Sequence, residues 1–227
     1  TVLVTVNMMD TGGTALGGSN QAPAKTFTLA VAAVNDPPVL AALKPVRVPE
    51  DGSTNVVVSL SDLDNAISSV TLAATSSNEN LVSNTGLALS GTGATRTLTI
   101  APRPDANGTN TIRLVADDQS GGRTTNSFLL TVLPVNDAPS FTLVSDRVVV
   151  TNAVLATISN FATNLSKGPT NESNQTLSFT VTPTNATFFA VKPAISPTGT
   201  LTFRPKTNSV GATTVSVVLK DNAGGAA

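Results

Sequence analysis

The sequence predicts an all-β protein made of repeated antiparallel sandwiches, and three observations support this fold class. Apolar and polar residues alternate over short segments such as 127–132, where Phe128, Leu130 and Val132 fall on one face of an extended strand. Threonine is abundant, and its branched Cβ suits extended backbone. Strand and turn patterns recur at an interval of about 100 residues, the size of one small sandwich. We therefore expect no substantial helix.

The interval is set by a motif, Val-Asn-Asp-x-Pro, that occurs at 34–38 and again at 135–139. The two copies are 101 positions apart. The strand predicted at 127–132 has a counterpart at 26–31, directly before the first copy of the motif. Each motif therefore follows the last strand of a sandwich and marks a junction between two repeats.

A second set of matches confirms that the repeat is real. The segment 97–102 corresponds to 200–205, which lies 103 positions further on. The turn 118–122, with its aspartate and paired glycines, recurs at 221–225 at the same offset. Agreement of strand, turn and proline at one spacing is the signature of an internal repeat.

These matches predict three units. Residues 1–38 supply the C-terminal strands of one partial sandwich domain, residues 39–139 form a complete one, and residues 140–227 form a sandwich that lacks its last strand. On this division the chain begins and ends inside a domain. We therefore expect it to be a segment of a longer molecule.

The composition excludes several classes of function. Cys, His, Trp and Tyr are absent, which removes thiol and imidazole nucleophiles or bases and the usual zinc ligands and leaves only carboxylates, lysines and hydroxyls for chemistry, so we expect no enzyme. The net charge of −1 offers no basic surface for nucleic acid. No apolar run approaches the roughly 20 residues of a membrane helix, so we expect no membrane insertion in this segment.

Acidic side chains are expected to gather at the two junctions. Strand direction in a seven-stranded sandwich places loop 61–65 and turn 118–122 at the upper end, and turns 49–52 and 104–108 at the lower end. Carboxylate and amide oxygens are the ligands that Ca²⁺ prefers. The candidate metal ligands are Asn35, Asp36, Asp62, Asp64 and Asp118 at the first junction, and Glu50, Asp51, Asp105, Asn136, Asp137 and Asp221 at the second.

The junction motif resembles that of the bacterial cadherin-like and immunoglobulin-like tandem repeats, which build long surface adhesins and extracellular fibres. The resemblance implies immunoglobulin-like sandwiches, an extracellular or cell-surface location in a bacterium, and Ca²⁺ that stiffens each junction. By similarity, the incoming half of a cadherin calcium clasp is matched by Asp36, Asp62, Asp64 and Asp118, and the outgoing half by Glu50, Asp105 and Asp137. The expected partners are neighbouring repeats of the same chain.

Other interpretations stay open at this point. Asp, Asn and Gly are ordinary turn formers, so the acidic loops do not require a metal. The third unit also offers few ligands at its upper end, where Asn164 and Glu172 accompany Asp221. One alternative function is a module that recognises a glycan or a surface protein. Another is a self-assembling fibre, in which a strand from one copy completes the unfinished sandwich of the next.

Overall fold

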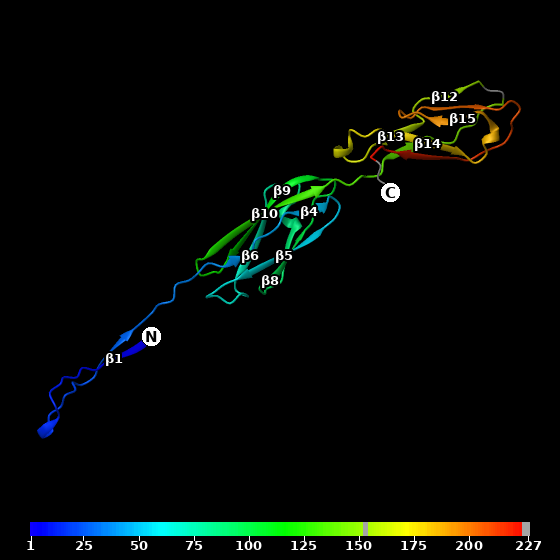
Figure 1. Ribbon diagram of the computed structural model, residues 1–227. Coiled ribbons are helices and arrows are strands. Elements are labelled where there is room, and N and C mark those ends of the chain that lie inside the picture. Colours follow the sequence, from blue (N-terminus) through cyan, green and yellow to red (C-terminus); the bar gives the residue numbers. More distant parts are fainter. Residues whose placement is uncertain (152–153, 224–227) are drawn as a thin grey trace.

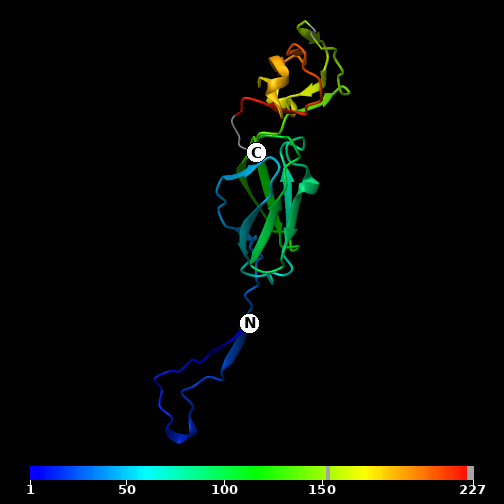
Figure 2. The same cartoon turned by 90° about the vertical axis from the view of Figure 1, so that its right-hand side faces the viewer.

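The computed structural model describes residues 1–151 and 154–223 and confirms the predicted fold class. A hairpin, a central sandwich and a third sandwich follow one another along one long axis (Figures 1 and 2). Within the described residues there is no α-helix, and the helical elements are short 3₁₀ turns. The described part of the chain contains no helix long and apolar enough to span a membrane.

The N-terminal hairpin consists of β1 (Val2–Val6) and β2 (Lys25–Leu29), which pair antiparallel. A long connection containing the 3₁₀ turn η1 (Ala15–Gly17) joins them. The apolar side chains of the hairpin are largely exposed, and Phe27 keeps 53% of its surface in contact with solvent. An isolated two-stranded hairpin is only marginally stable in water.

The central sandwich has two four-stranded sheets, ordered β4-β10-β9-β6 and β3-β5-β8-β7. The chain between the first motif and turn 49–52 is divided between the two sheets, so that β3 pairs with β5 while β4 pairs parallel to β10. The strands are β3 (Val39–Leu40), β4 (Val46–Pro49), β5 (Thr54–Ser61), β6 (Thr71–Ser76), β7 (Leu87–Ser90), β8 (Thr95–Ile100), β9 (Gly108–Asp117) and β10 (Arg123–Leu133), with the 3₁₀ turn η2 (Asn84–Gly86) before β7.

The core of the central sandwich follows from the alternation in its strands. Phe128, Leu130 and Val132 of β10 are buried, as the pattern predicts, and they face Leu98 and Ile100 of β8 in the opposite sheet. Burying a side chain of this size contributes roughly 1.5–3 kcal/mol. The core spans the sandwich and fixes the positions of the loops at its two ends.

The third sandwich repeats this plan with a smaller core. Its buried residues include Leu201 and Phe203 of β16, which occupy the places of Leu98 and Ile100 of β8. The elements are β11 (Ser140–Leu143), β12 (Ala156–Ile158), β13 (Ala162–Ser166), η3 (Thr170–Glu172), β14 (Ser178–Pro183), η4 (Ala186–Phe188), β15 (Phe189–Ile195), β16 (Leu201–Pro205) and β17 (Val215–Lys220). The sheets are ordered β12-β16-β15, β14-β17 and β11-β13.

One edge of the third sandwich is left open within the described residues. Strand β9 of the central sandwich pairs with both β6 and β10, whereas β17 pairs with β14 alone. Residues 144–150, at the place of β4, form no strand, and Val148 and Val150 are 98% and 77% exposed. In the central sandwich β4 is held by its parallel pairing with β10, and among the described residues β17 has no neighbour at the corresponding side.

Candidate metal centre at the domain junction

The first linker docks onto the top of the central sandwich through three hydrogen bonds. The side-chain amide of Asn35 donates to Asp118 Oδ2 at 2.7 Å, and Asn65 Nδ2 donates to Asn35 Oδ1 at 2.8 Å. The backbone N–H of Asp36 donates to Asp64 Oδ2 at 2.7 Å. The motif that follows the hairpin is therefore bound by the sandwich that comes after it.

Asp118 is the anchor of this linker. It is 1% exposed, and the hydrogen bond from Asn35 holds its carboxyl pKa below the ordinary value, against the opposing effect of burial. Backbone N–H groups of Ser120 and Gly122 also donate to Asp118 Oδ1. A Cβ on Gly122 would collide with the Asp118 carboxylate and would lie 2.7 Å from Pro37 Cα. Gly122 thus permits the close approach of linker and turn.

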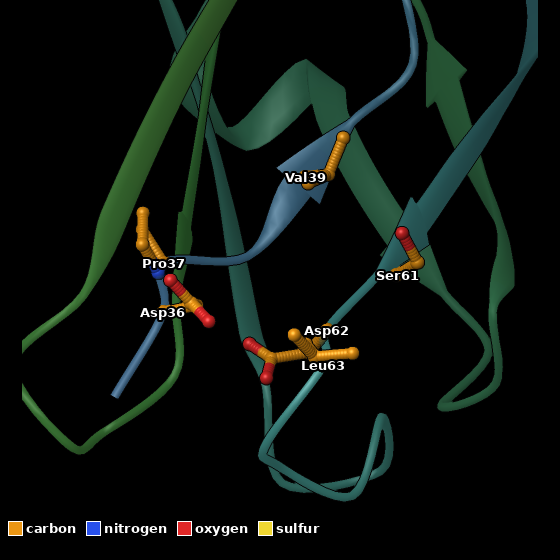
Figure 3. A pocket seen from close by; sticks show the side chains of 6 residues that line it. All are labelled: Asp36, Pro37, Val39, Ser61, Asp62 and Leu63. Carbon is orange, nitrogen blue, oxygen red and sulfur yellow. The ribbon is translucent and has the colours of Figure 1, made fainter. Parts of the chain in front are cut away.

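Two further acids line a hollow of about 610 Å³ beside this linker. Asp36, Asp62 and Leu63 are among the residues that line it, and Figure 3 shows that they come from the linker and from the loop after β5. Asp62 Oδ1 accepts the backbone N–H groups of Asp64 and Asn65, while Asp62 Oδ2 is buried without a hydrogen-bond partner. This oxygen is the one buried carboxylate atom without a hydrogen-bond partner among the described residues at the first junction.

The second linker repeats the arrangement of the first. The side-chain amide of Asn136 donates to Asp221 Oδ2 at 3.3 Å, and Gln175 Nε2 donates to Asn136 Oδ1 at 2.9 Å. The backbone N–H of Asp137 donates to Glu172 Oε1 at 2.9 Å. Each Asn-Asp pair is thus held by an aspartate, an amide and a carboxylate of the following sandwich.

The second junction adds an acidic cluster that the first does not have. Ligand oxygens of Asp51, Asp105 and Asp137 all lie within 4.8 Å of one another, which holds for no other set of three acids in the described residues. Asp51 and Asp105 come from the base of the central sandwich, and Asp137 comes from the linker. Asp105 has a positive φ of 56°, which turns the chain sharply at this point.

The charges of this cluster are not compensated by protein groups. Burial, followed by the charges of Asp51, Asp105, Glu172 and Glu50, raises the pKa of Asp137 above its ordinary value. Among the described residues one ion pair forms between side chains, and it joins strands β9 and β10 at the other end of the sandwich. Asp137 and the four carboxylates that raise its pKa therefore share one junction without a basic partner among the described residues.

Several oxygens at this junction also lack hydrogen-bond donors. Asp137 Oδ2, Glu172 Oε2 and Gln175 Oε1 are buried and unpartnered, and Glu172 as a whole is 5% exposed. Buried acceptors are normally satisfied, so each such atom suggests a ligand. A cation with oxygen ligands would satisfy these atoms and neutralise the cluster, which makes the residues a fit for Ca²⁺.

Glu50 lies beside the cluster but in a different state. It is 1% exposed, and its carboxylate accepts the Val135 backbone N–H at 2.8 Å. Asn107 Nδ2 donates to Glu50 Oε2 at 3.2 Å, and Asn171 Nδ2 donates to Oε1 at 3.2 Å and to Oε2 at 3.4 Å. Both oxygens of Glu50 are therefore occupied by amide donors.

Residues 35–131 match the family described as the bacterial Ig domain, and the matched range begins at Asn35 of the first motif. The central sandwich is thus similar to a bacterial Ig domain. The start of the match agrees with the hydrogen bonds that bind Asn35 and Asp36 into this sandwich. No curated protein matches the chain by sequence.

The chain is also similar to solved tandem-domain structures. The extracellular cadherin domains 1–5 of protocadherin gamma B2 share 16% identity over 96% of this chain and 45% of that one, with a TM-score of 0.49. Drosophila N-cadherin EC1-4 shares 13% identity over 96% of this chain and 56% of that one, with a TM-score of 0.46. Domains 4–9 of the surface layer protein SbsC share 12% identity over 90% of this chain and 33% of that one, with a TM-score of 0.34. The chain thus spans about half or less of each.

The candidate ligands predicted from the sequence fall into three groups in the structure. Asp51, Asp105 and Asp137 form the cluster, and Asp36 and Asp62 border the hollow at the first junction. The remaining ones are engaged in hydrogen bonds, namely Asn35, Asp64 and Asp118 at the first junction and Glu50, Asn136 and Asp221 at the second.

Sequence reasoning missed the partners that the following sandwich provides. Asn65 and Gln175 hold the linker asparagines, and Asn171 contacts Glu50. Glu172 was noted in the upper loop of the third unit but not placed among the ligands. Their shared signal is a polar loop at the upper end of each sandwich, and this loop differs in length between repeats.

We predict that Gly122→Ala destabilises the central sandwich by about 1–3 kcal/mol, because a methyl group would force Pro37 and Asp118 apart. Gly93→Ala is the matched control, since a Cβ at Gly93 meets nothing within 4 Å. Urea unfolding of both variants tests this expectation. Equal midpoints for the two variants would contradict the close approach of linker and turn.

We predict a pH dependence of the second junction in cation-free buffer. The pKa of Asp137 is raised above its ordinary value of 3.8 in the docked state, so docking favours its protonated form. This stabilisation is fully present below pH 3.8 and is lost as the pH rises through the raised pKa. Small-angle scattering in chelator should show a narrower range of interdomain arrangements at about pH 4 than at about pH 7. Asp137→Asn should remove the difference, and a difference that persists would assign it to another group.

Proposed function

We propose that this chain is a structural segment of a long extracellular tandem-repeat adhesin or fibre, in which Ca²⁺ stiffens the junction between consecutive sandwiches. The observation that carries the proposal is the uncompensated cluster of Asp51, Asp105 and Asp137 at a domain boundary. Its work is mechanical, because it spans distance from a cell surface and holds neighbouring domains in line. The proposal extends to a bacterial cell-surface location and to a non-enzymatic role.

The proposed domains are the three units 1–38, 39–139 and 140–227. The separate cores of the central and third sandwiches support this division. The linker residues bind the sandwich that follows them, so each rigid unit includes the Asn-Asp pair at its N-terminal side. A hinge then remains between this pair and the base of the preceding sandwich, which is where the acidic cluster lies.

At the second junction, Asp51, Asp105, Asp137 and Glu172 would hold the ion. These residues come from the preceding sandwich, the linker and the following sandwich, so one ion would join all three. When bound, Ca²⁺ supplies positive charge that offsets the repulsion among the carboxylates. The protein's contribution is to bring acidic oxygens from three segments together. Water would complete the six to eight oxygen ligands that Ca²⁺ takes.

At the first junction we propose weaker binding. Asp36 and Asp62 offer carboxylates beside the hollow, but Asp64 and Asp118 already accept hydrogen bonds from the linker. The N-terminal hairpin contributes a single acidic residue before the motif, Asp10, which accepts a hydrogen bond from Gly12 in its own turn. The outgoing half of a calcium clasp is therefore not supplied by these residues.

Calcium titration of the chain tests the main proposal. Isothermal titration should give a dissociation constant within the roughly 10⁻⁴ to 10⁻³ M range of extracellular modules. Asp105→Asn should weaken binding about tenfold or more, because it removes a charge from the cluster. Asp146→Asn is the control, since Asp146 is an exposed acid outside the junction. Equal affinity of the two variants, or no binding by the parent chain, would sink the proposed stiffening.

A second candidate function is self-assembly by strand addition, and the open edge of β17 favours it. By the repeat, β2 of another copy corresponds to β10, which pairs with β9, and β9 corresponds to β17. The register of β10 and β9 then places Thr26 of one copy opposite Ser216 of the other. Strand β2 would have to leave β1, which a marginal hairpin permits.

We predict that the double variant T26C/S216C forms disulfide-linked oligomers if this second function operates. The chain has no native cysteine, so the crosslink has no background. The control is T26C/K192C, because Lys192 is exposed on β15, away from β17. Oxidation followed by denaturing electrophoresis gives the readout. Monomers only, or equal crosslinking of the control, would exclude strand addition between copies.

A further inference from the structure

The carboxylate of Glu50 connects three segments of the chain at the second junction. One donor, Asn107, belongs to the lower turn of the central sandwich, and a second, the Val135 N–H, belongs to the linker. The third donor, Asn171, lies in η3 of the third sandwich, 121 positions away in sequence. Asn171 therefore reaches across the junction and contacts the preceding domain directly.

Glu50 and the acidic cluster differ in how their charge is stabilised. The N–H donors around Glu50 come from the protein itself, and hydrogen bonds to an ionised carboxylate are stronger than those between neutral groups. The cluster carries buried oxygens on Asp137 and Glu172 that have no donor. The first arrangement is complete without a cation, whereas the second calls for one.

We propose that Glu50 and Asn171 form a cation-independent clasp between the central and third sandwiches, with the loop 167–175 as its arm. The clasp retains contact between the domains when Ca²⁺ is absent, and the acidic cluster adds stiffness when Ca²⁺ binds. The stiffening by Ca²⁺ at the acidic cluster rests on the proposed function. The clasp itself does not, because its partners are protein groups alone.

The loop is built to present Asn171. Lys167 Nζ donates to the Ser173 carbonyl at 2.7 Å and closes the loop at its base. The Glu172 N–H donates to the Pro169 carbonyl at 3.0 Å and forms the turn that carries Asn171. Gly168 has a φ of +119°, and a Cβ there would collide with the Glu172 carboxylate. These contacts fix the loop at the height of the junction.

Electron paramagnetic resonance distance measurements test the clasp on the full chain. Spin labels at S90C and K192C, both exposed positions, report on the two sandwiches, and the chain offers no competing cysteine. In chelator, Asn171→Ala should lower the ratio of docked to undocked molecules about tenfold, as loss of a hydrogen bond to a charged group implies. Asn174→Ala, at an exposed position in the same loop, should leave this ratio unchanged.

The same measurements with added Ca²⁺ distinguish the clasp from the proposed stiffening by Ca²⁺. Asp105→Asn removes one of the repelling charges, so it should narrow the distance distribution in chelator relative to the parent chain and should abolish the further narrowing by Ca²⁺. Asn171→Ala should broaden the distribution in chelator whether or not Ca²⁺ narrows it later. If Asn171→Ala and Asn174→Ala give the same distribution in chelator, the clasp is wrong even where calcium stiffening holds. If Asn171→Ala acts while Ca²⁺ has no effect on the parent chain, the clasp stands and the calcium function fails.

Discussion

The organisation of this chain depends on the hydrogen bonds that bind each Asn-Asp linker to the sandwich after it. Asn35 and Asn136 each donate to a turn aspartate and accept from a side-chain amide, and the next residue donates its N–H to a carboxylate. An asparagine suits this place because its amide carries both donors and an acceptor. The linker is thereby part of the following domain, which leaves the connection to the preceding domain as the place where motion is possible.

This asymmetry explains why the acidic cluster lies where it does. Asp137 is fixed by the following sandwich, while Asp51 and Asp105 are fixed by the preceding one. Their mutual repulsion acts across the hinge and opposes its closure, and after burial it is the second cause that raises the pKa of Asp137. An ion that offsets the repulsion would act on the hinge alone, because the linker's own attachment uses separate hydrogen bonds.

The sequence predicted the parts of this structure that depend on local pattern. Alternation placed Phe128, Leu130 and Val132 in the core, and the repeat placed Leu201 and Phe203 of β16 at the sites of the buried residues of β8. It did not predict that the first strand would divide between the two sheets. That division depends on the pairing of β4 with β10, which brings together segments far apart in the chain and has no local signature.

The contacts across the junction were unpredictable for a related reason. Asn171 contacts Glu50 because the third sandwich carries the loop 167–175. The offset between repeats changes from 101 at the motif to 103 at later strands, so the loops differ in length. Comparison of the repeats therefore does not reveal which loop residues meet across the junction. Acidic residues are visible in a sequence, but the donors that satisfy them are not. Glu50 and Asp51 are adjacent in the sequence. Amide donors surround the carboxylate of Glu50, whereas the carboxylate of Asp51 lies beside those of Asp105 and Asp137. The chemistry of a junction is therefore decided by which neighbours the fold supplies, and two adjacent acids can serve opposite purposes within it.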